Sequence, residues 1–318
     1  MTRLSLAALL LTTAPLAAEV PRVVADVPIN HALAALVMGD LGTPELLLAQ
    51  GGDPHHAQLR PSQARSVATA DLVIWTGAAM SPWMHDVVET LAAGRVLELA
   101  NVPGLVTQPF AGAIRFETDE EGHDEAGHDH EGHGHDDEHE GHADDGIDPH
   151  QWLNTANAEL WLGAIAADLS ALDPDNALVY ATNASVAAGS LAVLGAELAQ
   201  ILQPAQGAGL VMYHDAYGYF ASQFGLTILG TIADGEAADP GAARISALRA
   251  QLAEAGATCI FPEVNHSDAF ARVVAEGSDL RIGAALDPAG VMLTPGPDLY
   301  AQAMRQTAQA IADCISAP

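Results

Sequence analysis

Positive charge is scarce in this 318-residue chain. It contains no lysine, and its 11 arginines stand against 41 acidic residues, for a formal net charge of −30 at pH 7. Nucleic-acid binding rests on neutralising phosphates with basic side chains, so this balance argues against a nucleic-acid partner and against a basic patch for a membrane surface. A strongly acidic chain instead attracts cations.

We also find no apolar run in the sequence that is long enough to span a membrane. The N-terminal run, Leu4–Leu16, follows Arg3 and precedes the small residues Ala17 and Ala18. A short basic region, an apolar stretch of this length and small residues at the end are typical of a secretory signal peptide. We therefore predict a signal peptide over residues 1–18 and an exported mature chain; a buried N-terminal helix is the alternative.

Cysteine is limited to Cys259 and Cys314, and there is no Cys-x-x-Cys motif. Two cysteines in an exported chain favour one structural disulfide over two buried thiols. The pair would close a loop of roughly 55 residues, which in the chain-entropy model contributes about 4 kcal/mol to stability.

One segment differs from the rest of the chain. Residues 119–148 contain fourteen Asp or Glu, seven His and no Arg. Such a stretch cannot bury enough apolar surface to fold, so we predict a disordered loop. Imidazoles among carboxylates offer many weak sites for divalent cations, so we interpret the segment as an auxiliary metal-binding loop. The alternative is a run of charged residues that is only solvated. The auxiliary metal-binding residues would be His123, His128, His130, His133, His135, His139 and His142.

Elsewhere the pattern alternates strands and helices, which predicts parallel sheets covered by helices. The expected strands are 22–27, 45–49, 72–75, 95–99, 209–213, 227–230, 259–262 and 281–286. The expected helices are 29–40, 62–70, 83–93, 216–224, 240–255, 268–276 and 299–314. Asp173 and Pro174 are a start signal for a further helix of about 28 residues, roughly 42 Å long.

The predicted fold class is therefore α/β, with two lobes, each a parallel sheet with flanking helices, joined by one long rigid helix. The expected domains are an N-terminal lobe over 19–170, which includes the loop 119–148, a connecting helix over 171–203, and a C-terminal lobe over 204–318.

Three histidines outside the acidic segment share a local setting, just past a strand end and beside a turn signal: His55, His150 and His214. Ligands of open α/β sheets collect at the carboxyl ends of the strands. Three imidazoles converging there would make a site of three nitrogen ligands, which suits Zn²⁺. Their spacing alone is a weak signal, because a single histidine is more often structural.

Four stretches make the signal specific. They are DPHHAQLRPSQA (53–64), DPHQWLN (148–154), YHDAYGYF (213–220) and LDPAG (286–290). With ADLVIWTGAAM (70–80), the acidic His-rich segment and the two C-terminal cysteines, they resemble the zinc-specific periplasmic binding proteins of ABC importers, the ZnuA type, over nearly the whole mature chain.

The resemblance implies that His55, His150 and His214 bind the metal, and that Asp287 matches a carboxylate that is a ligand in several members. Manganese-binding relatives carry Glu at the position of His214, so histidine there favours Zn²⁺. Some zinc-binding members have Glu before the first histidine, where this chain has Pro54. Asp287 or a water is therefore the expected fourth ligand.

The same resemblance implies a periplasmic protein, expected to be a monomer, that captures Zn(II) and delivers it to the permease of an ABC importer. A manganese or general divalent-metal importer subunit and a periplasmic zinc chaperone are the alternatives. A zinc hydrolase would need a general base, for which Glu263 is the candidate, and no HExxH-type motif is present. We expect a protein that is not an enzyme.

Of the other histidines, His31 is expected to be structural, His56 to lie on the surface and His85 on an exposed helix face. His266 is a candidate auxiliary metal contact, on a turn near the cleft. Asp215 is expected to support a neighbouring group rather than to bind metal.

Overall fold

The computed structural model describes residues 20–110, 146–233 and 240–317. The N-terminal sheet consists of four parallel strands in the order β2-β1-β3-β4. Its central strands are continuous apolar runs, as expected of strands covered on both faces. The bounds are β1 Val23–Ala25, β2 Glu45–Leu46, β3 Leu72–Trp75 and β4 Arg95–Glu98.

The C-terminal sheet repeats this arrangement, with four parallel strands in the order β6-β5-β7-β8. The equivalent central strand of each sheet, β1 or β5, therefore lies between the next two strands along the chain. The bounds are β5 Gly209–Met212, β6 Thr227–Thr231, β7 Ala257–Ile260 and β8 Arg281–Ile282. Below, the N-terminal lobe means β1–β4 with α1–α3, and the C-terminal lobe means β5–β8 with α6–α8.

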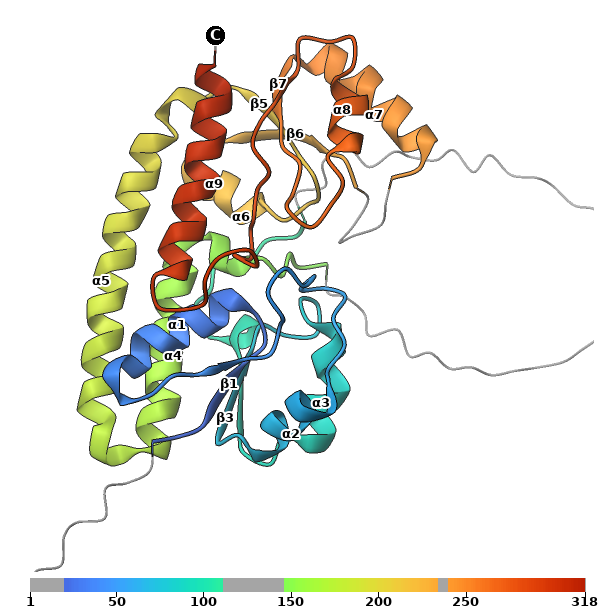
Figure 1. The fold of residues 1–318 in the computed structure, drawn as a ribbon. Helices are drawn as coiled ribbons and strands as arrows, with labels where there is room; N and C mark the ends of the chain where they lie inside the picture. Colours follow the sequence, from blue (N-terminus) through green and yellow to red (C-terminus); the bar gives the residue numbers. More distant parts are fainter. Residues whose placement is uncertain (1–19, 111–145, 234–239, 318) are drawn as a thin grey trace, which may run out of the picture.

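The helices flank both sheets, and four of them form a layer along one side of the molecule (Figure 1). In that layer α5 contacts α1, α4 and α9. The bounds are α1 Pro28–Met38, α2 Pro61–Thr69, α3 His85–Leu91, α4 Thr155–Leu172, α5 Ala177–Ile201, α6 Gly218–Phe224, α7 Ala242–Ala255, α8 Ala269–Ala275 and α9 Leu299–Ser316. The predicted fold class, two parallel-sheet lobes with a long helix between them, is confirmed.

The connecting helix differs from expectation in one respect. Pro174–Ile201, a 3₁₀ turn followed by α5, is long and apolar enough to cross a membrane, with a mean hydropathy of 1.5. The expectation that no run beyond the N-terminus reaches that length was therefore wrong, because alanine and valine spread apolar character around the whole helix. Tyr180, Leu191 and Leu198 are buried against α1, α4 and α9, but only 28% of the apolar window is buried, and Leu178 and Val193 are exposed.

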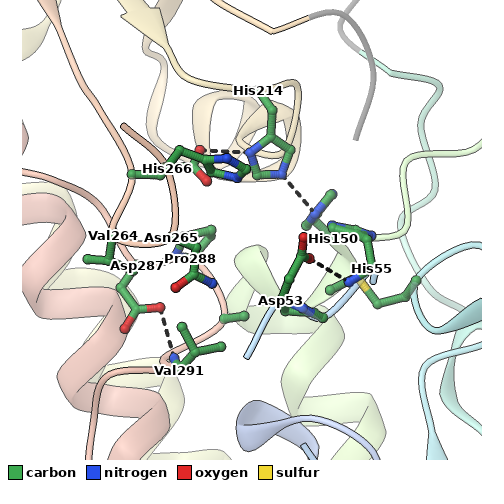
Figure 2. Close-up of a pocket in the computed structure, with 14 residues that line it drawn as sticks. Asp53, His55, His150, His214, Val264, Asn265, His266, Asp287, Pro288 and Val291 are labelled. Carbon is green, nitrogen blue, oxygen red and sulfur yellow. Dashed lines mark hydrogen bonds and ion pairs between the residues drawn. The ribbon is translucent and has the colours of Figure 1, made fainter. Parts of the chain in front are cut away.

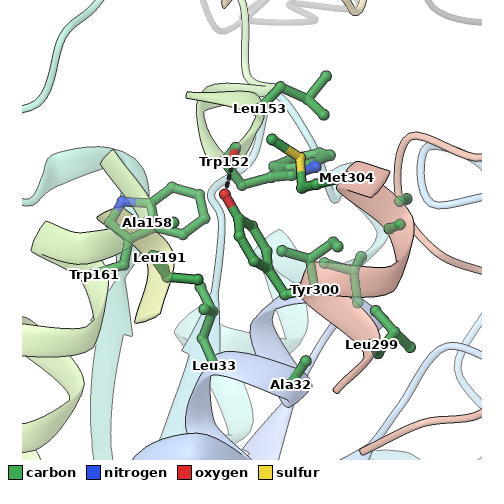
Figure 3. Packing of buried hydrophobic residues seen from close by; sticks show 14 of the residues in the cluster. Ala32, Leu33, Trp152, Leu153, Ala158, Trp161, Leu191, Leu299, Tyr300 and Met304 are labelled. Atoms are coloured by element: carbon green, nitrogen blue, oxygen red, sulfur yellow. Dashed lines mark hydrogen bonds between the residues drawn. The ribbon is translucent and has the colours of Figure 1, made fainter. Parts of the chain in front are cut away.

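The two lobes share one hydrophobic core. A single cluster of buried residues includes Ile74 from β3 and Leu210 from β5. Tyr300 of α9 and Trp161 of α4 belong to it, and the Tyr300 hydroxyl donates a 2.8 Å hydrogen bond to the carbonyl of Trp152 (Figure 3). Because interiors are close-packed, a large rotation of one lobe against the other would break this core.

A buried carboxylate ties the ends of the N-terminal strands together. Asp26 follows β1, is fully buried and accepts four hydrogen bonds of 2.7–3.1 Å. Burial raises its pKa, against the opposing effect of these donors. Two of them are the Thr76 backbone amide, just past β3, and the Ser81 hydroxyl. Asp26 thus fixes the turn before Ser81, where Met80 lines the cavity described below.

Several predictions fall on residues that the structure does not describe. The signal peptide over 1–18 and all seven histidines of the acidic segment lie outside the described residues. The end of that segment is a correction, because Ile147 pairs with Pro109 and Asp148 is fully buried. The boundary of the predicted disordered loop at residue 148 was therefore too late. The predicted domain bounds at 170 and 203 stay predictions.

The predicted disulfide between Cys259 and Cys314 is confirmed. It joins β7 to α9, and its cysteines are 55 positions apart in the sequence. Because α9 belongs to the shared helical layer, the disulfide fastens the C-terminal sheet to that layer.

Replacing both cysteines with alanine should lower the free energy of unfolding by about 4 kcal/mol, because the unfolded chain loses a closed loop of this length. Urea unfolding of the metal-free wild type and double variant measures the difference. A loss under about 1 kcal/mol would show that the disulfide does not constrain the unfolded state as described.

Candidate metal centre

Three histidines from separate parts of the chain converge between the lobes (Figure 2). His55, His150 and His214 are all buried, and one ring nitrogen of each lies within 4.8 Å of the others. Their ring centroids are 5.2–5.9 Å apart. The structure therefore brings together the three histidines that the sequence predicted as metal ligands.

Each histidine is placed by the end of an element. His214 follows β5 after one residue, and His55 lies in the loop between β2 and α2. His150 follows the bridge between Ile147 and Pro109 and is the N-cap residue of the 3₁₀ turn Gln151–Leu153. In both sheets the carboxyl ends of the parallel strands face the same gap, which is where open α/β sheets bind ligands.

Two buried carboxylates orient two of the rings. Asp148 Oδ1 lies 2.8 Å from His150 Nδ1, and Glu263 Oε1 lies 2.7 Å from His214 Nδ1. An ionised carboxylate only accepts hydrogen bonds, so each Nδ1 carries the proton and donates. Each Nε2 of the neutral imidazoles then presents a lone pair, in the carboxylate–histidine arrangement that is usual around bound zinc.

The two Nε2 atoms of His150 and His214 lie 3.4 Å apart. Two lone pairs facing each other at this distance repel, unless a proton or a cation lies between them. Around a tetrahedral zinc with Zn–N bonds of about 2.05 Å, neighbouring nitrogens are about 3.3 Å apart. The observed separation therefore matches that of two ligands on one zinc ion.

An Asp-Pro-His sequence builds two of the three ligand turns. In each, the aspartate Oδ1 accepts a 2.9 Å hydrogen bond from the histidine backbone amide, Asp53 from His55 and Asp148 from His150. This Asx turn fixes where the histidine leaves the backbone. Trp83 Nε1 donates a further 2.7 Å hydrogen bond to the carbonyl of Pro54 and so holds the first turn against the 3₁₀ turn Pro82–Met84, just before α3.

The histidines line a cavity of about 30 Å³, which has room for an ion and a water but not for an organic ligand of ordinary size. Asp53, Glu263 and Asp287 also line it, and no arginine is among its described lining residues. Burial, with the charges of Glu263 and Asp287, raises the pKa of Tyr217 well above its usual value. Tyr217 is not among the described residues that line the cavity, so the imidazoles and carboxylates of the cavity are the candidate ligands for a cation.

Asp287 lines the same cavity but is not part of the three-histidine cluster. Its Oδ1 accepts a 2.9 Å hydrogen bond from the Val291 amide, and its Oδ2 accepts one of equal length from the Met292 amide. Burial raises the pKa of this carboxyl, while these donors act to lower it. Its role as fourth ligand stays a prediction.

The other histidines that the structure describes are not members of the cluster. His31 is buried, with Nε2 3.0 Å from the carbonyl oxygen of Pro44, and His56 is exposed beside Asp53. His85 lies beside Asp86 and Glu89, with 25% of its side chain exposed. His266 lines the cavity and stacks on Tyr213 at a centroid distance of 4.1 Å.

The sequence did not predict the three carboxylates that position the ligands. The repeated Asp-Pro-His could have identified Asp53 and Asp148, because Asp-Pro is a common turn signal and both instances precede a predicted ligand. No sequence signal pairs Glu263 with His214, because the residues are 49 apart and meet only when β5 and β7 align.

The fold and the site together define a two-lobed α/β protein with a histidine-lined cavity for a metal ion. The sequence matches the family model ZnuA, described as "Zinc-uptake complex component A periplasmic", over residues 23–314. The chain therefore belongs to the ZnuA family.

Two relatives illustrate the match. The high-affinity zinc uptake system protein ZnuA of Paracoccus denitrificans (strain Pd 1222) is 49% identical over 99% of this chain and 98% of its own length. The protein of the same name from Brucella suis biovar 1 (strain 1330) is 34% identical over 95% of this chain and 93% of its own.

Solved structures share the fold. A crystal structure of ZnuA has a TM-score of 0.72 at 21% identity and covers 93% of this chain and 99% of its own. The protein FpvC of Pseudomonas aeruginosa, in complex with Mn²⁺, has a TM-score of 0.73 at 18% identity and covers 93% of this chain and 98% of its own.

Replacing Glu263 with alanine should weaken zinc binding about 10- to 100-fold, because the His214 ring loses the partner that sets its tautomer and orientation. Glu263→Gln, whose amide oxygen can still accept from Nδ1, should lose less. Competition with a chromogenic chelator measures the affinity, and Glu254→Ala, an exposed glutamate on α7, is the matched control. Equal affinities for Glu263→Ala and this control would contradict the orienting role.

Proposed function

We propose that this chain is the periplasmic zinc-binding protein of an ABC importer, which captures one Zn²⁺ between its lobes and delivers it to the membrane permease. The observation that carries the proposal is the separation of 3.4 Å between His150 Nε2 and His214 Nε2, with both Nδ1 atoms held by buried carboxylates. Family membership and the names of its relatives support zinc as the cargo.

Zinc would be held by His55, His150 and His214, with Asp287 or a water as the fourth ligand. Three imidazoles favour Zn²⁺ over Mn²⁺, which is a harder cation and prefers oxygen ligands. The buried carboxylates Asp148 and Glu263 offset the charge of the ion and strengthen the basicity of the two rings that they contact. Binding requires neutral imidazoles, so no proton remains on the metal-facing nitrogens.

An enzymatic function has less support from the site. Glu263, the candidate base for a hydrolase, is hydrogen-bonded to His214 Nδ1, on the side of the ring away from Nε2. A general base must instead contact the water to be activated. We therefore propose a binding protein without catalytic turnover, and zinc-loaded protein that hydrolyses ester or peptide substrates would contradict this.

The proposed location in the periplasm and the fold suggest how the protein collects and releases zinc. We propose that residues 1–18 direct export to the periplasm, that the mature protein acts as a monomer, and that the seven histidines of the acidic segment collect zinc weakly near the cleft. Because the two lobes share one core, release would take place by a small displacement of the ligand loops at the permease rather than by a wide opening.

Zinc titration calorimetry can distinguish binding in the cleft from binding by the acidic segment. It compares three proteins: the mature chain, a variant lacking residues 119–140, and His55→Ala in that shortened background. One tight site should survive the deletion and lose at least 100-fold in affinity on His55→Ala, because a ligand is removed. His56→Ala, an exposed neighbour, is the control. Tight binding that disappears with the deletion and is unaffected by His55→Ala would overturn the cleft as the zinc site.

Competition between Zn²⁺ and Mn²⁺ in the shortened chain tests the cargo. We expect Zn²⁺ to displace Mn²⁺ when the two are equimolar, because the cluster offers three nitrogen ligands. Preference for Mn²⁺ would instead support the manganese importer.

Zinc affinity should fall as the pH drops through about 6.5, the ordinary pKa of histidine, because protons compete with the metal for the imidazole nitrogens. Chelator competition at several pH values between 7.5 and 5.5 measures the decline. An affinity that does not change across this range would contradict histidine ligation.

A further inference from the structure

The segment Leu286–Met292 contacts the portions of the chain that carry all three histidines. It lies between β8 and α9 and contains a turn closed by its own aspartate. Asp287 accepts from the amides of Val291 and Met292, one on each carboxylate oxygen, at 2.9 Å. Gly290 within the turn has φ +67°, and a Cβ there would lie 2.7 Å from the Leu299 side chain, so the turn packs closely on α9.

The His55 loop is attached to this turn by two hydrogen bonds. The Gly51 amide donates to the carbonyl of Val291 at 2.9 Å, and the Gln50 side chain donates to the carbonyl of Met292 at 3.3 Å. The peptide group between Val291 and Met292 therefore donates to Asp287 and accepts from Gly51. Hydrogen bonds linked through one peptide group polarise and strengthen each other.

The other two histidines are attached to the same segment. Trp152, whose ring lies 5.3 Å from that of His150, donates from Nε1 to the carbonyl of Pro288 at 2.9 Å. Leu286 is bridged to Glu263, through the Val264 amide to the Leu286 carbonyl at 3.1 Å and the Leu286 amide to the Pro262 carbonyl at 2.9 Å. Glu263 in turn holds His214.

We propose that Asp287 is a positioning residue that closes the turn Asp287–Met292 and thereby sets the mutual spacing of His55, His150 and His214. The effect of this role on zinc binding rests on the proposed function. The hydrogen bonds that define the role do not, because they join only protein groups. It is separate from ligation, since a carboxylate whose oxygens each accept a backbone amide can hold the turn with or without a metal contact.

The first test needs no metal. In metal-free Asp287→Ala, hydrogen exchange at the Gly51 amide should accelerate at least tenfold relative to wild type, because the turn that accepts from Gly51 is no longer closed. Asp298→Ala, an exposed aspartate just before α9 with no side-chain capping bond, is the matched control and should not change it. Unchanged exchange at Gly51 in Asp287→Ala would overturn the proposal.

The second test separates positioning from ligation. Zinc release to excess chelator should be at least tenfold faster for Asp287→Ala, and less so for Asp287→Asn, whose amide oxygen still accepts one backbone amide. The visible spectrum of the Co²⁺-loaded Asp287→Asn protein reports on ligation alone. A spectrum that matches wild type leaves a water as the fourth ligand, and a shifted one makes Asp287 a ligand as well; with faster Gly51 exchange in Asp287→Ala, either result supports the positioning role. A shifted spectrum with normal Gly51 exchange would make Asp287 a ligand only and overturn the positioning role.

Trp152→Phe provides a variant that leaves the carboxylate intact. It keeps an aromatic ring beside His150 but removes the Nε1 donor to Pro288, so zinc release should again accelerate without a change in the Co²⁺ spectrum. Zinc release as slow as in wild type would contradict the attachment of His150 to the segment Leu286–Met292 through Trp152. If the wild-type protein does not bind zinc tightly while Gly51 exchange in Asp287→Ala responds as predicted, the proposed function fails and the positioning role of Asp287 stands.

Discussion

The site depends on two imidazole nitrogens that face each other. His150 Nε2 and His214 Nε2 lie 3.4 Å apart because Asp148 and Glu263 hold the opposite side of each ring. Both carboxylates are buried, where an ion without a partner is costly, so the hydrogen bonds to the imidazoles are strong and well defined. The protein is therefore built with two negative charges behind two lone pairs, an arrangement complementary to a dication.

The fold brings the members of this arrangement together from distant parts of the chain. The two sheets have the same strand order, and the carboxyl ends of β1 and β5 face the common gap. The helical layer of α1, α4, α5 and α9 fastens the sheets on one side, and the segment Leu286–Met292 links the ligand loops between them. The shared core resists wide opening, so the exchange of an ion depends on these loops.

The alternation of apolar runs and helical patterns predicted the fold class, because each element follows from local pattern and turn chemistry. The family motifs predicted the three histidines that the structure brings together. The burial of Asp148 could not be predicted from the sequence. Asp148 lies at the end of an acidic stretch, which indicates exposure, and only tertiary contacts bury it. The bonds from Gln50 and Gly51 to Met292 and Val291 were equally inaccessible, since they join residues 240 or more positions apart.

Anomalous diffraction at the zinc absorption edge, from crystals of the zinc-loaded chain without residues 119–140, tests the central claim most directly. The account predicts one strong peak between His55, His150 and His214, about 2.0–2.1 Å from one nitrogen of each. A peak elsewhere, or one that contacts only carboxylates, would contradict it.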